Sequence, residues 1–170
     1  MKLNPRSIAL CAVLTALALG LSTLENLFPV TLIVPLPGVK LGLANIVTVF
    51  ALYELGAVPA LTILTARCLL GGVFAGNLSA LLFSLLGGFT AMLVMIALKH
   101  CKGLSIYGVS IGGAAAHNLG QMAAAVITLG STMVLGYLPF LLAVSLVTGT
   151  LTGFVAGLLF RAMRNIHLSH

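Results

Sequence analysis

Ionisable and amide side chains are rare in this sequence, and those that interrupt its apolar runs are the candidates for chemistry. Arg67 stands near the middle of an apolar segment, in "TARCLLGG". His117, Asn118 and Gln121 cluster in "AAAHNLGQMAA", where His117 and Gln121, four residues apart, share one helix face. Charged groups inside apolar segments are costly and usually face the protein interior or a cavity. A guanidinium beside amide groups could bind and orient an anionic ligand.

Further polar residues lie near one end of the same apolar segments. Asn45 falls in the first half of its segment, and Glu25, Lys40 and Asn77 fall close to segment ends. We expect all of these residues to line one cavity that opens on the outer side of a membrane. Because basic groups outnumber Glu25 there, the cavity would favour a small molecule with an anionic part.

Each candidate also has a structural alternative. Arg67 could bond a buried backbone carbonyl or pair with Glu54. The group around His117 could supply hydrogen bonds between helices. Lys40 could reach the membrane interface with its ammonium group, and Glu25 could pair with Lys40.

Composition places these residues in a membrane. Of 170 residues, 61% are hydrophobic and 6% are charged, against about 25% charged in soluble domains. Because a membrane-crossing helix needs about 20 apolar residues, we predict one all-α integral membrane domain over residues 1–170, a bundle of six transmembrane helices. The predicted spans are 7–24, 40–56, 58–76, 78–98, 105–129 and 135–160, with an outer loop at 25–39.

The distribution of Lys and Arg predicts the orientation. Basic residues in short loops stay on the cytoplasmic side, and six spans place both termini there. Only Lys40 then lies outside. The predicted cytoplasmic charges are Lys2, Arg6, Lys99, Lys102, Arg161 and Arg164.

Several function classes are excluded or disfavoured. The net charge of +6 comes from residues at span ends, so we expect no nucleic-acid partner. The sequence contains no aspartate, which excludes aspartate-rich Mg²⁺ sites that hold diphosphates. It has no G-x-x-x-x-G-K-[ST] phosphate loop and no G-x-S-x-G nucleophile motif. We therefore expect a non-enzyme without metal or cofactor, the three scattered cysteines being free thiols or apolar fillers.

Three motifs carry a family resemblance over nearly the whole chain: "LPGVKLGLANIVTVFALYELG", "STLENLFP" and "GAAAHNLGQ". They resemble the bacterial Gx transporter family, whose members also carry the name heptaprenyl diphosphate synthase component I. That family is similar to the S-components of energy-coupling factor (ECF) transporters. S-components are six-helix proteins of the bacterial cytoplasmic membrane that bind micronutrients from outside.

The resemblance implies partners as well as a fold. An S-component works with a transmembrane T-component and two ATPases, and a small-residue A-x-x-x-A motif on its first helix packs against the T-component. Ala12 and Ala16 match that motif, and Gly20 extends it. Small residues on other spans, such as Gly149, Gly153 and Gly157, predict close packing inside the bundle.

Three functions follow from these observations. The first is the substrate-binding subunit of an ECF-type importer for a small anionic micronutrient or precursor. The second is a non-catalytic membrane subunit of heptaprenyl diphosphate synthase in isoprenoid or quinone biosynthesis, partnered by a soluble catalytic subunit. The third is a structural membrane scaffold, for which Arg67 and His117 would affect stability alone.

Overall fold

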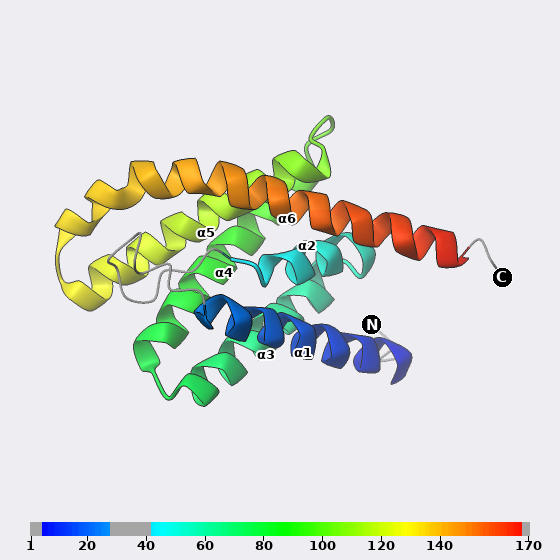
Figure 1. Ribbon diagram of the computed structural model, residues 1–170, viewed down its shortest axis with the longest axis horizontal. Helices are drawn as coiled ribbons and strands as arrows, with labels where there is room; N and C mark the ends of the chain where they lie inside the picture. Colours follow the sequence, from blue (N-terminus) through cyan, green and yellow to red (C-terminus); the bar gives the residue numbers. More distant parts are fainter. Residues whose placement is uncertain (1–4, 28–41, 168–170) are drawn as a thin grey trace.

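The computed structural model describes residues 5–27 and 42–167, and within them every regular element is a helix (Figure 1). The prediction of an all-α fold is confirmed. The helices are α1 (Pro5–Leu27), α2 (Asn45–Glu54), α3 (Ala57–Ala75), α4 (Leu78–Lys99), α5 (Ile106–Leu129) and α6 (Leu138–His167), with a 3₁₀ helix, η2 (Thr132–Tyr137), before α6.

Local sequence signals set the helix ends. Gly76 ends α3 in the left-handed conformation, with φ +57°, a conformation that costs glycine little. Asn77 then begins α4, because its side-chain oxygen accepts bonds from the backbone N–H groups of Ser79 (2.9 Å) and Ala80 (3.3 Å). Gly130 ends α5 in the same left-handed way. These signals keep the connections between helices short.

Four helical segments are long and apolar enough to cross a membrane: Pro5–Glu25, Ala57–Ala75, Leu78–Lys99 and Thr132–Ala162. They match four of the predicted spans closely. The predicted spans 40–56 and 105–129 also contain helices, but α2 has only 10 residues and α5 is not among the four. The predicted outer loop 25–39 lies outside the described residues from position 28 onward.

The interior position of α2 and α5 explains why they differ from the other helices. Residues 45–52 of α2 are all buried, and the helix contacts α1, α3, α4 and α6. The most extensive helix contacts are those of α5 with α4 on one side and α6 on the other. A helix enclosed by protein need not be as apolar as one that faces lipid, so α5 can carry polar side chains.

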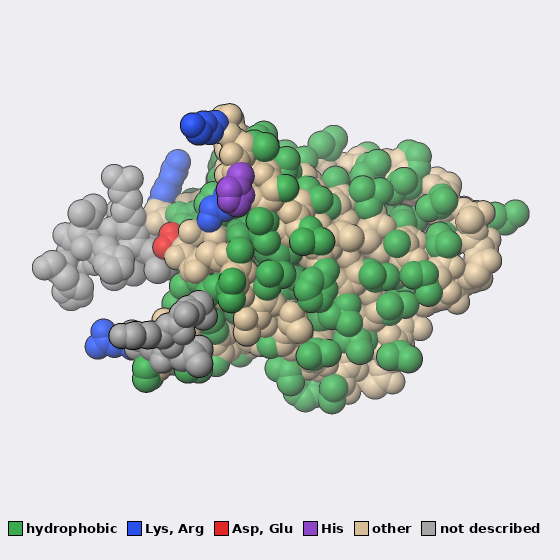
Figure 2. All heavy atoms as spheres, turned by 180° about the vertical axis from the view of Figure 1, so that it is seen from behind, with side chains coloured by type: hydrophobic (Ala, Val, Ile, Leu, Met, Phe, Trp, Pro, Cys, Tyr) green, Lys and Arg blue, Asp and Glu red, His purple; other side chains and the backbone are tan. Residues whose placement is uncertain are grey.

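Charged side chains are concentrated at one end of the molecule. Figure 2 shows Lys and Arg side chains gathered at one end of the face drawn, while the rest of that face is hydrophobic or uncharged. The beginning of α1 and the end of α6 lie at this same end (Figure 1). Here Lys99 Nζ donates to the Leu52 carbonyl at 2.8 Å and lies 4.8 Å from the centre of the Tyr53 ring. Lys99 therefore also joins the ends of α4 and α2.

Candidate functional site

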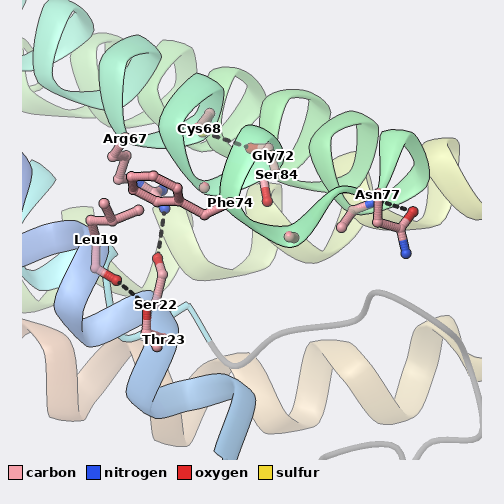
Figure 3. A pocket seen from close by; sticks show the side chains of 12 residues that line it. Leu19, Ser22, Thr23, Arg67, Cys68, Gly72, Phe74, Asn77 and Ser84 are labelled. Atoms are coloured by element: carbon pink, nitrogen blue, oxygen red, sulfur yellow. Dashed lines mark hydrogen bonds between the residues drawn. The ribbon is translucent and has the colours of Figure 1, made fainter.

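A buried arginine on α3 forms the centre of the site. Arg67 is only 7% exposed. Its Nη1 donates to Ser22 Oγ on α1 at 3.4 Å (Figure 3). Its Nη2 donates to Asn45 Oδ1 at the start of α2, also at 3.4 Å. Both distances exceed the usual range of about 2.7–3.2 Å, so the guanidinium is held loosely between α1 and α2.

The bonds of Arg67 leave its charge without an anionic partner among the described residues. Both acceptors are neutral oxygens. Within residues 5–27 and 42–167, the Nε of Arg67 has no hydrogen-bond partner. A guanidinium has five N–H donors and never loses its proton in proteins. Arg67 therefore keeps donors for a group that the described residues do not supply.

A cavity of about 350 Å³ lies beside Arg67, among α1, α3 and α4 (Figure 3). This volume is near the lower end of the range for small-molecule pockets, about 300–1,000 Å³. Gly71 and Gly72 of α3, together with Leu19 and Phe74, form much of the apolar wall. The polar groups in the wall come from Ser22, Thr23, Arg67, Cys68, Asn77 and Ser84.

A hydrogen bond connects the end of α1 to the turn before α2. The buried carboxylate of Glu25 accepts a hydrogen bond from the Gly42 backbone N–H. Gly42 has φ +84°, which favours glycine, and a Cβ there would lie 3.0 Å from Asn45 Nδ2. Glycine thus lets Asn45 fold back against this turn while accepting the bond from Arg67.

His117 and Gln121 of α5 pack against α4, and His117 also adjoins this turn. They are 4% and 0% exposed. A Cβ at Gly87 of α4 would lie 2.9 Å from His117 Cε1 and 3.0 Å from Gln121 Cγ, and a Cβ at Gly42 would lie 3.6 Å from His117 Cδ2. His117 therefore occupies the space between α4 and the start of α2, room that Gly87 provides. We call Glu25, Asn45, His117 and Gln121 the polar core.

The predicted residues thus fall into two connected groups. Arg67 and Asn77 line the cavity, whereas the polar core lies outside its wall. The bond between Arg67 and Asn45 joins the two groups. Asn77 also serves as the N-cap of α4, a structural role beside its place in the cavity.

Asn118 turns away from both groups. Its Nδ2 donates to the Leu141 carbonyl on α6 at 2.7 Å. This is the interhelical bond that formed the structural alternative for the cluster on α5. Lys40 lies outside the described residues, so its predicted binding role stays a prediction.

The comparison with family models decides which family the chain represents. The model described as heptaprenyl diphosphate synthase component I matches residues 14–159, which include every described residue of the cavity and the polar core. The chain belongs to this family. No curated protein and no solved structure gives a significant match.

The component I chain leaves the small-residue face of α1 uncovered. Ala12, Ala16 and Gly20 are all exposed, and a Cβ at Gly20 would meet nothing within 4 Å. Predicted contact of this face with a T-component is not tested by the fold. Among the described residues, no group of three or more His, Cys, Asp or Glu side chains is placed to hold a metal ion.

Sequence reasoning missed several cavity residues of this component I chain. Ser22, Thr23 and Ser84 line the cavity, and the Cys68 thiol donates to the Ser84 carbonyl at 3.4 Å. Hydroxyl residues are common in membrane helices, where many bond their own backbone, as Thr23 bonds the Leu19 carbonyl. The one available signal was the position of Ser22 a single turn before Glu25, on the same helix face.

Proposed function

We propose that this chain is a non-catalytic membrane subunit that binds a small anionic molecule in the cavity beside Arg67. The observation that carries the proposal is a guanidinium that is 7% exposed, faces a cavity of about 350 Å³ and bonds only neutral oxygens among the described residues. A buried charge without a counterion is strongly destabilising. An anionic ligand would supply the missing counterion.

The residues do not support catalysis by this chain alone. Its two acidic residues are Glu25, whose carboxylate accepts from Gly42, and Glu54, which is exposed at the end of α2. Glu25 lies near the end of α1 and contacts the turn before α2, whereas Glu54 is the last residue of α2, so they do not form a carboxylate pair. Prenyl transfer to a diphosphate substrate depends on carboxylates that hold Mg²⁺, and a partner would have to provide them.

The family name supports one assembly for this subunit. A component of heptaprenyl diphosphate synthase implies a partner synthase subunit. In this assembly the present chain is the membrane component of isoprenoid or quinone biosynthesis, and the soluble partner carries the Mg²⁺ site.

A second assembly, an ECF-type importer, has a specific observation in its favour. The face formed by Ala12, Ala16 and Gly20 is exposed on α1, where close approach of another membrane helix is possible. The chain would then bind its ligand from outside a bacterial cytoplasmic membrane. Docking on a T-component and two ATPases would release the ligand inward as the whole subunit tilts.

One set of variants tests ligand binding. Arg67→Gln removes the guanidinium, and Lys102→Gln removes an exposed positive charge from the α4–α5 turn. The proposal predicts that small anions retained by the purified wild type are lost from Arg67→Gln and kept by Lys102→Gln. Equal retention by all three folded proteins, judged by mass spectrometry and size-exclusion chromatography, contradicts it.

Co-purification separates the two assemblies. Ala16→Leu adds bulk to the exposed face of α1, and Ala143→Leu adds the same bulk to an exposed position on α6. An importer predicts capture of a T-component that Ala16→Leu weakens and Ala143→Leu does not. Capture of an aspartate-rich soluble subunit, without any T-component, identifies the synthase assembly instead.

A further inference from the structure

We propose that the ligand presents a single carboxylate to Arg67 and that the cavity rejects diphosphates. This inference rests on the proposed function, because it names the chemical class of the anion that Arg67 holds. It follows from the number of positive charges near the cavity, from the size of the cavity, and from the groups in its wall.

The described part of the cavity can neutralise one negative charge. Within residues 5–27 and 42–167, Arg67 is the only Lys or Arg in the cavity wall. The described side chains of Arg6, Lys99, Lys102 and Arg161 lie near the start of α1, the end of α4 and the end of α6, away from the end of α1 that borders the cavity.

A diphosphate would leave uncompensated charge in this setting. It carries two or three negative charges, which proteins normally balance with several cations or with Mg²⁺ bound to carboxylates. Among the described residues no such metal-binding group exists. Because Arg67 is buried and is one positive charge, its guanidinium matches a single carboxylate, which it can bind with two parallel N–H bonds.

The size and lining of the cavity agree with a compact, polar ligand. A cavity of about 350 Å³ cannot enclose a heptaprenyl chain. Elsewhere in the cavity wall, the hydroxyls of Thr23 and Ser84 and the amide of Asn77 offer neutral hydrogen-bonding groups, and the Ser22 hydroxyl lies beside Arg67. These groups suit hydroxyl, amide or ring-nitrogen substituents on the body of a small carboxylic acid.

The test uses the full-length chain purified in detergent and incubated with a total water-soluble metabolite extract. Bound compounds are released and identified by mass spectrometry, with inorganic diphosphate added as a competitor. We expect the wild type and Lys102→Gln to retain a monocarboxylate. The amount retained by Arg67→Gln should fall by about tenfold or more. Diphosphate should not displace it.

Other outcomes refute the carboxylate assignment alone, or both that assignment and the proposed function. Retention of a phosphate or diphosphate that depends on Arg67 refutes the carboxylate assignment and leaves the proposed function standing. If no anion is retained, or if retention does not depend on Arg67, both are refuted.

A second variant covers a failure of Arg67→Gln to fold. A Cβ at Gly71 would make an ordinary 3.5 Å contact with Leu19 Cδ1, and the remainder of a Leu side chain there would enter the cavity. Gly71→Leu should therefore lose the monocarboxylate while Arg67 stays in place. Undiminished binding to a folded Gly71→Leu protein also refutes the carboxylate assignment at this cavity.

Discussion

Replacing Gly149 by alanine would force α6 away from α5. A Cβ at Gly149 would lie 2.5 Å from Ile111 Cα and 3.0 Å from both Ile111 N and Ser110 O, whereas ordinary contacts begin at 3.4 Å. All three atoms belong to the α5 backbone, so no side chain can rotate away. The two helices must separate by about 1 Å, which is overpacking of an interior contact.

The change in unfolding free energy caused by Gly149→Ala follows from two opposing terms. Overpacking a well-packed interior costs about 1–3 kcal/mol, while alanine in a helix interior is favoured over glycine by about 1 kcal/mol. Gly157→Ala, on the same helix, provides the control, because a Cβ there meets nothing within 4 Å, so the close packing predicted at Gly157 is wrong. Both variants share the propensity gain, so their difference in unfolding free energy, about 1–3 kcal/mol, measures the packing term alone.

Reversible unfolding in mixed micelles, followed by circular dichroism, measures this difference. We expect Gly149→Ala to unfold at lower denaturant than Gly157→Ala, and Gly157→Ala to match or exceed the wild type. Equal stability of the two variants would refute the close α5–α6 contact and the packing argument built on it.

Three further outcomes are expected. Asn118→Leu, which removes the 2.7 Å bond to the Leu141 carbonyl, should lower the unfolding free energy by about 1 kcal/mol without loss of ligand; ligand loss from a folded variant contradicts its purely structural role. Asn77→Ala should lose about 1 kcal/mol of α4 capping that Asn77→Ser largely restores, in the same unfolding assay. A membrane-impermeant maleimide should label exposed Cys101 only after cells are opened, and labelling of intact cells would reverse the predicted orientation.

The helical framework was largely predictable because its signals are local. Gly76, Asn77 and Gly130 mark helix ends through backbone conformation and capping, and each does so in the structure. What local signals could not show is which helices face lipid. The short helix α2 is enclosed by other helices, and α5 lies between α4 and α6, which allows it to carry polar side chains.

The candidate site was only partly predictable. Arg67 was evident because a charge inside an apolar segment requires an explanation. Its contacts with Ser22 and Asn45 join residues far apart in the sequence, and no spacing rule predicts them. Asn118 shows the same limit at short range: it follows His117 directly, yet it points to α6 because successive residues face different sides of a helix.

By itself, the sequence determined that this chain is apolar and helical, that it has no aspartate for holding Mg²⁺, and that Arg67 is buried in one of its apolar segments. Those properties depend on residue type and on near neighbours. Only the tertiary structure decided that Arg67 faces a cavity among α1, α3 and α4, and that His117 and Gln121 pack against Gly87. The physical reason is that a cavity is the space left where helices distant in sequence do not meet, and helix packing alone determines that space.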